Sequence, residues 1–147
     1  MEEIERLSGI LKKASASLSS ISAEDAAYQS APEQWSKKQE LGHLVDSACN
    51  NHQLIVRAQV EEEPSLPDYD GDRWVMLHDY QAMKWQQIVE RWQIMNEQLL
   101  RAASKISSQT AERRLTVGEK SMTLGFLVKD YVDHMLHHLR HIGVDFS

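Results

Sequence analysis

The chain has 147 residues and a formal net charge of −6, with 16 Lys and Arg residues against 22 Asp and Glu residues. A chain of this length forms one domain by default, here residues 1–147, and its acidic balance provides no basic surface for nucleic acid. Its apolar runs are too short to cross a membrane, its N-terminus lacks a secretion-signal pattern, and its one cysteine, Cys49, cannot form an internal disulfide. We therefore expect a cytoplasmic protein with no membrane or nucleic-acid partner.

Apolar residues at alternating steps of three and four predict long helices along the chain. The first helix is expected from about residue 3 to about residue 21. The second begins after Ser36, which forms a capping box with Gln39, and continues to about Val60. A crossover over about 61–73 then contains Pro64, and it is long enough to let the second and third helices run parallel.

The third helix is expected over about 74–106, along an apolar seam that includes Trp85 and Trp92. A short hairpin over about 114–122, turning around Gly118, precedes the last helix. That helix has Thr123 as its N-cap and ends at about Ile142. Four amphipathic helices in a short chain predict an all-α fold, a four-helix bundle with a long crossover between helices two and three.

Histidines concentrate on the last helix, where four of the seven fall close together: His134, His137, His138 and His141. The helical repeat places His134 and His138 at or inside the apolar face, and His141 at its margin. Their i, i+4 spacing stacks two imidazoles on one side of a helix, the arrangement with which a helix supplies two ligands to one metal ion. We therefore predict a metal site facing the interior of the bundle.

Two histidines of the second helix compete to be the third ligand. Periodicity favours His52, which lies nearer the apolar seam than His43. Depth along the bundle gives a second test, in which His43 is level with the pair if helices two and four are antiparallel, and His52 is level if they are parallel. The residues alone leave both assignments open.

Polar residues near these histidines are candidates for a pocket or for support of the ligands. Asp130 precedes His134 by one helical turn and is a candidate acceptor for its ring, while Asn51 and Tyr131 occupy seam positions facing the pocket. Glu40 and His43 form a Glu-x-x-His motif of the kind found in dinuclear carboxylate bundles. That class needs a second such motif, which the last helix lacks.

Three segments together resemble DinB-like proteins, in particular the branch containing the bacillithiol transferases, first described provisionally as metal-dependent hydrolases. The segments are Trp35–Ser47 with Asn50–His52, Tyr69–Trp74, and Met122–Ile142. The resemblance implies parallel second and third helices joined by a long crossover. It also implies one divalent ion, most often nickel or zinc, held by His43, His134 and His138, with His52 as a packing residue.

The resemblance further implies a hydrolase or a thiol S-transferase that acts on a small-molecule substrate, in the second case with a low-molecular-weight thiol. Three imidazoles with open coordination positions are typical of catalytic rather than structural metal sites. We expect the chain to form a homodimer. The alternative is a non-catalytic helical bundle for interaction or dimerisation, with a vestigial metal site.

Overall fold

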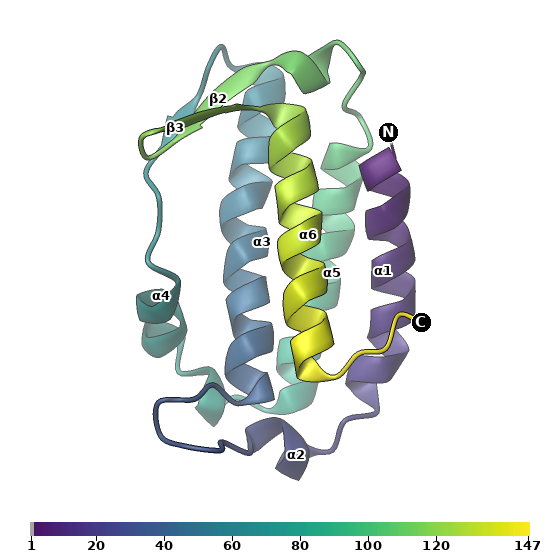
Figure 1. Cartoon of the computed structure of the whole chain (residues 1–147), viewed down its shortest axis with the longest axis vertical. Helices are drawn as coiled ribbons and strands as arrows, with labels where there is room; N and C mark the ends of the chain where they lie inside the picture. Colours follow the sequence, from purple (N-terminus) through teal and green to yellow (C-terminus); the bar gives the residue numbers. More distant parts are fainter. Residues whose placement is uncertain (1) are drawn as a thin grey trace.

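Four long helices lie side by side in the computed structural model, which describes residues 2–147. They are α1 (Glu2–Ser19), α3 (Lys37–Val60), α5 (Trp85–Ala103) and α6 (Leu124–Ile142). In Figure 1, α3 and α5 run parallel to each other and antiparallel to α1 and α6. Helix α3 packs against both α5 and α6, and α1 packs against the same two helices from the other side. The four-helix bundle predicted from the sequence is confirmed.

Local capping sets the start of the two helices that carry the histidines. Ser36 accepts a hydrogen bond from the backbone N–H of Gln39, whose side chain accepts one from the N–H of Ser36, so the predicted capping box is present. Thr123 caps α6 through the N–H of Phe126. Helix α6 ends at Gly143, whose φ of 118° is a left-handed conformation that glycine adopts readily.

The crossover is longer than predicted, because the expected helix over 74–106 is interrupted. Residues 61–84 contain β1 (Ser65–Leu66), α4 (Gly71–His78) and the short 3-10 helix η1 (Tyr80–Ala82) before α5 begins. The break lies at Asp79, which has a left-handed φ of 48°. The Tyr80 side chain, 4% exposed, turns inward there and donates a 2.6 Å hydrogen bond to buried Asp46 of α3.

A small sheet closes the end of the bundle from which α6 starts (Figure 1). The predicted hairpin is confirmed as β2 (Arg114–Val117) and β3 (Lys120–Thr123), with Gly118 at a φ of 61° in the turn. Strand β1 of the crossover pairs in parallel with β2, so the sheet order is β1-β2-β3. The sheet therefore ties the crossover to the hairpin that precedes α6.

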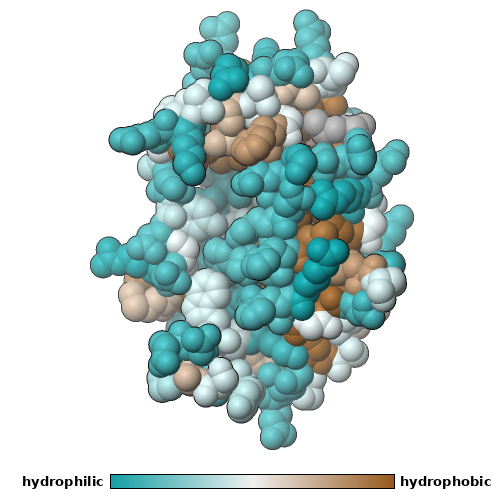
Figure 2. Space-filling view, in the orientation of Figure 1, coloured by the Kyte–Doolittle hydropathy of each residue, from teal (hydrophilic) through white to brown (hydrophobic). Residues whose placement is uncertain are grey.

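Two further short elements lie outside the predicted helices, α2 (Ala23–Ala27) and the 3-10 helix η2 (Thr110–Glu112). The core is formed by the apolar seams of the four long helices, with Trp92, Leu99 and Leu139 fully buried. Figure 2 shows a mainly hydrophilic face, with hydrophobic atoms gathered in a strip between α6 and α1. Among residues 2–147, no helix is long and apolar enough to span a bilayer.

Candidate metal centre

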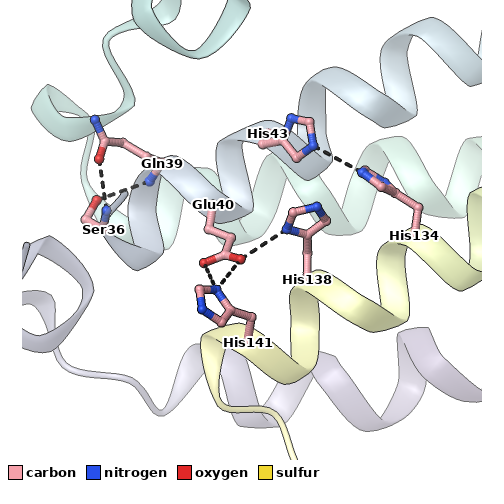
Figure 3. A network of polar contacts seen from close by, with 7 residues as sticks. All are labelled: Ser36, Gln39, Glu40, His43, His134, His138 and His141. Atoms are coloured by element: carbon pink, nitrogen blue, oxygen red, sulfur yellow. Dashed lines mark hydrogen bonds and ion pairs between the residues drawn. The ribbon is translucent and has the colours of Figure 1, made fainter. Parts of the chain in front are cut away.

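Three imidazoles converge where α3 and α6 lie antiparallel. His43 comes from the first turns of α3, and His134 and His138 lie one turn apart on α6. One ring nitrogen from each lies within 4.8 Å of the other two, and the Nε2 atoms of His43 and His134 are 3.2 Å apart (Figure 3). His52 is not part of this cluster. The antiparallel arrangement thus brings His43 to the pair, as the depth argument required for these helix directions.

The spacing and the burial of these rings suit a shared cation. Two imidazoles bound to one zinc ion at ~2.05 Å with a near-tetrahedral angle have nitrogens ~3.3 Å apart, close to the separation found here. His43 is 9% exposed, and its Nδ1 is buried with no hydrogen-bond partner among the described residues. That nitrogen faces Gly71, whereas Nε2 of His43 faces His134, and an ion bound there would pair the ring nitrogens that face one another.

Electrostatics keeps two of the rings neutral. Burial, with the neighbouring imidazoles of His134 and His138, lowers the pKa of His43 from 6.5 to about 4. Burial and the adjacent His138 likewise lower the pKa of His134 to about 4. Near neutral pH these rings therefore carry free lone pairs, the protonation state that metal binding requires.

Glu40 forms a hydrogen bond with the imidazole of the third histidine, His138. Glu40 is 6% exposed, and its carboxylate lies 3.0 Å from Nδ1 of His138, and 2.6 and 2.7 Å from Nδ1 of His141 (Figure 3). Burial would raise the pKa of Glu40, but the hydrogen bonds from His138 and His141 outweigh it and leave that pKa below 4.5. A charged carboxylate accepts from N–H, so His138 carries its proton on Nδ1 and presents Nε2 to the cluster.

Glu40 is the supporting residue that the sequence analysis did not assign. The Glu-x-x-His spacing to His43 was the available signal, since it places Glu40 one turn away on the same helix. The partners of the carboxylate, however, lie on α6, about 100 residues later in the chain. His141, a predicted margin residue, lies on the outer side of Glu40 with 73% of its side chain exposed.

Two neighbours cover the outer face of His43. The Trp35 ring lies 5.1 Å from the His43 ring, centroid to centroid, at 45°. The start of α4 approaches the same ring, because a Cβ at Gly71 would lie 3.1 Å from Cε1 of His43. Glycine therefore permits the backbone of α4 to rest against this imidazole, which keeps bulk water away from one side of the cluster.

A cavity of about 240 Å³ opens beside His134. Its walls come from α3, the crossover, the hairpin and α6, and they include the predicted pocket residues Asn51, Asp130 and Tyr131. Asp130 is exposed and makes no hydrogen bond to His134 among the described residues, so the structure places it on the cavity wall and not behind the ring. Of the three imidazoles, His134 lines this cavity, so a small molecule entering from the hairpin side would meet the cluster at His134.

The structure is thus a four-helix bundle with parallel α3 and α5 and a partly buried cluster of three histidines. The chain belongs to the DinB superfamily, which its residues 6–142 match. It is 28% identical over 143 residues to an Oceanobacillus iheyensis protein provisionally named a metal-dependent hydrolase, which covers 97% of this chain and 81% of that relative. A similarly named Halalkalibacterium halodurans protein is 25% identical over 114 residues, or 74% of this chain and 63% of that relative.

Solved structures show the same fold. YfiT from Bacillus subtilis, described provisionally as a metal-dependent hydrolase with an unusual four-helix bundle topology, superposes with a TM-score of 0.84 at 21% identity over 96% of this chain and 82% of its own. A mycothiol-dependent maleylpyruvate isomerase superposes with a TM-score of 0.79 at 13% identity. The match covers 97% of this chain but 60% of the isomerase, so this chain corresponds to only part of that enzyme.

Proposed function

We propose that this protein is a metal-dependent enzyme, a hydrolase or a thiol S-transferase, in which His43, His134 and His138 hold one divalent ion, nickel or zinc. The observation that carries the proposal is the convergence of the three ring nitrogens within 4.8 Å. The names of the relatives support the hydrolase, and the mycothiol-dependent structural neighbour supports chemistry on a low-molecular-weight thiol. The substrate is a small molecule, since the cavity beside His134 has about 240 Å³.

A divalent ion held by three neutral imidazoles supplies a Lewis acid that lowers the pKa of water or of a thiol. The chain's own residues prepare the site for it. Glu40 fixes the orientation of His138, and Trp35 and Gly71 shield His43. One approach leads through the cavity, which His134 lines and whose wall is partly apolar and partly polar. A substrate is thereby held next to the histidines, with its reacting group directed at them.

Metal content after purification without an affinity tag tests the ligand set. We expect close to one divalent ion per wild-type chain and none in a His134→Ala/His138→Ala variant. A His52→Ala/His137→Ala variant is the matched control, since it also removes two histidines but neither belongs to the cluster. Equal metal content in the wild type and the first variant would contradict the proposal.

Turnover is tested separately, with ester substrates and with thiol transfer from bacillithiol, glutathione and coenzyme A, each with and without added metal. We expect activity that requires the ion and is lost in His43→Ala. A metal-loaded protein inactive in every assay would favour the non-catalytic bundle. The homodimer and the cytoplasmic location remain predictions, and sedimentation velocity measures the first.

A further inference from the structure

The cavity beside His134 exposes hydrogen-bond acceptors on its α3 side. The amide nitrogen of Asn51 donates to the backbone oxygen of Ser47 at 2.8 Å and to its hydroxyl at 3.3 Å. The amide nitrogen is thereby engaged on its own helix, and Oδ1 has no hydrogen-bond partner among the described residues, so it is the atom left for a ligand. Asn50 also directs its amide nitrogen to a backbone oxygen, that of Asp46, at 2.9 Å.

The α6 side of the cavity adds no donor from Tyr131. Its hydroxyl donates into the core, to Oδ1 of fully buried Asn96, whose amide nitrogen is in turn bonded to the backbone oxygen of Trp92. Tyr131 is 3% exposed, so it contributes a wall and not a free hydroxyl. Apart from His134, the polar side chain that this side leaves available is the carboxylate of Asp130, an acceptor.

Among the charged residues of the cavity wall, acceptors again outnumber donors. Asp68 of the crossover and Asp130 of α6 line the cavity, against one cation, Lys120 of β3. Within residues 2–147, no ion pair joins Lys120 to either carboxylate. The two negative charges therefore remain available to a ligand, on a chain whose own net charge is −6.

These acceptors lie at a distance from the histidines. Asp130 precedes His134 by one turn, ~6 Å along α6, and Asn51 follows His43 by eight residues, ~12 Å along α3. Because the helices are antiparallel, both displacements lead toward the hairpin. Leu54, Met122 and Leu127 also line the cavity and supply apolar wall.

We propose that this cavity binds a small molecule carrying a primary ammonium group, joined by an apolar stem to the atom that faces the three histidines. An ammonium donates three hydrogen bonds and complements the carboxylates and amide oxygens. A carboxylate tail at the same place would meet two like charges and one Lys. The proposal rests on the metal site of the proposed function and specifies the substrate class that this site takes.

Three thiols of equal length test the preference: 6-aminohexane-1-thiol, 6-mercaptohexan-1-ol and 6-mercaptohexanoate. Each is titrated into the cobalt-substituted protein, and the thiolate-to-cobalt charge-transfer band reports binding of the sulfur. We expect the amine to bind about tenfold more tightly than the carboxylate, a difference of ~1.4 kcal/mol, with the alcohol between them. Equal affinities, or a preference for the carboxylate, would overturn the proposal.

Variants identify the groups responsible. Asp130→Asn and Asp68→Asn should weaken binding of the amine and leave the alcohol unchanged, and Lys120→Met should increase the ratio of amine to carboxylate affinity. Asp133→Asn is the matched control on α6, since it removes the same charge from a residue paired with Arg6 and Lys129 outside the cavity. If this control lowers the preference as much as Asp130→Asn, net charge and not the cavity is responsible, and the proposal fails.

Two readouts separate this inference from the metal site. The visible d–d bands of cobalt, recorded before any thiol is added, report ion binding, and their absence would contradict the proposed function. Intact bands without an amine preference would contradict only the present inference. In the metal-free protein, hexylammonium should shift the NMR signals of Asn51 and Asp130, whereas hexanoate should not.

Discussion

At the scale of single residues, Glu40 determines which nitrogen of His138 is free. Replacing it with Gln keeps the shape of the side chain but removes the charge that accepts from Nδ1. We expect Glu40→Gln to weaken divalent-metal affinity by about 10- to 100-fold, as measured by competition with a chromophoric chelator. Nitrogen-15 NMR should show the proton of His138 no longer confined to Nδ1.

The control for Glu40 is His141→Ala, which removes its other, exposed partner and leaves the hydrogen bond to His138 in place. We expect a change in metal affinity of less than about fivefold, because a surface contact of this kind is worth ~0–1 kcal/mol. A loss in His141→Ala as large as in Glu40→Gln would mean that the pair acts as a unit, and would contradict the role given to Glu40 alone.

Two glycines provide a matched comparison of packing. A Cβ at Gly42 would lie 2.1–2.5 Å from atoms of the Tyr80 ring, whereas a Cβ at Gly9 on α1 meets nothing within 4 Å. We expect Gly42→Ala to lower the free energy of unfolding by ~1–3 kcal/mol, and Gly9→Ala to raise it by ~0.5–1 kcal/mol. Urea denaturation measures both. An unchanged free energy of unfolding in Gly42→Ala would mean that the Tyr80 ring can move aside, and would contradict close packing at this position.

At the scale of elements, local signals account for the helices that could be predicted. Helices α3 and α6 begin where Ser36 and Thr123 cap them, and such caps involve residues only three positions apart. Short α2 carries a comparable signal, because Ser22 accepts from the N–H of Asp25, but it lies in a polar stretch without a long apolar seam. Element starts were therefore predictable wherever a cap preceded a periodic segment.

The break between α4 and α5 could not be predicted from the local sequence pattern. No Gly or Pro lies between Asp79 and Lys84, so nothing in that stretch marks the end of a helix. The interruption follows from Tyr80, whose hydroxyl reaches Asp46, 34 positions earlier, and from the space that Gly42 leaves for its ring. A tertiary contact overrides the helical periodicity here, and periodicity alone cannot show it.

The candidate site also has a part that the sequence predicted and a part that only the fold could show. The spacing of His134 and His138 on one helix was readable from the sequence, whereas the choice between His43 and His52 depended on helix direction, which the bundle supplies. The role of Glu40 depends on two helices meeting, and no spacing within α3 reveals its partners on α6. Sequence thus identified candidate ligands, and the fold was needed to assemble them.

At the scale of the whole molecule, the lowered pKa values of His43 and His134 make stability depend on pH. Both lie near 4 in the folded chain against 6.5 ordinarily, so the folded metal-free protein binds protons less tightly than the unfolded chain. The stability that the two neutral imidazoles contribute is complete above pH 6.5 and is lost as the pH falls from 6.5 toward 4. Glu40, with its pKa below 4.5, acts in the same direction at lower pH.

We therefore expect the free energy of unfolding of the metal-free protein to fall between about pH 6.5 and about pH 4, by at most ~1.4 kcal/mol per pH unit for each imidazole. Urea denaturation across this range measures it. A His43→Leu/His134→Leu variant should show a much flatter profile, while Asp46, whose pKa burial raises, opposes the trend in both proteins. An identical slope in the two proteins would show that the imidazoles are not the cause.

The contact between His43 and His134 joins residues 91 positions apart. An ion shared by these residues would act as a reversible cross-link that closes most of the chain into a loop, a constraint that a single cysteine cannot provide. By the entropy of loop closure, such a link would disfavour the unfolded ensemble, as a disulfide of similar span does. Treatment with a chelator would then raise the equilibrium population of unfolded chains, and proteases would cleave the stripped protein throughout its length.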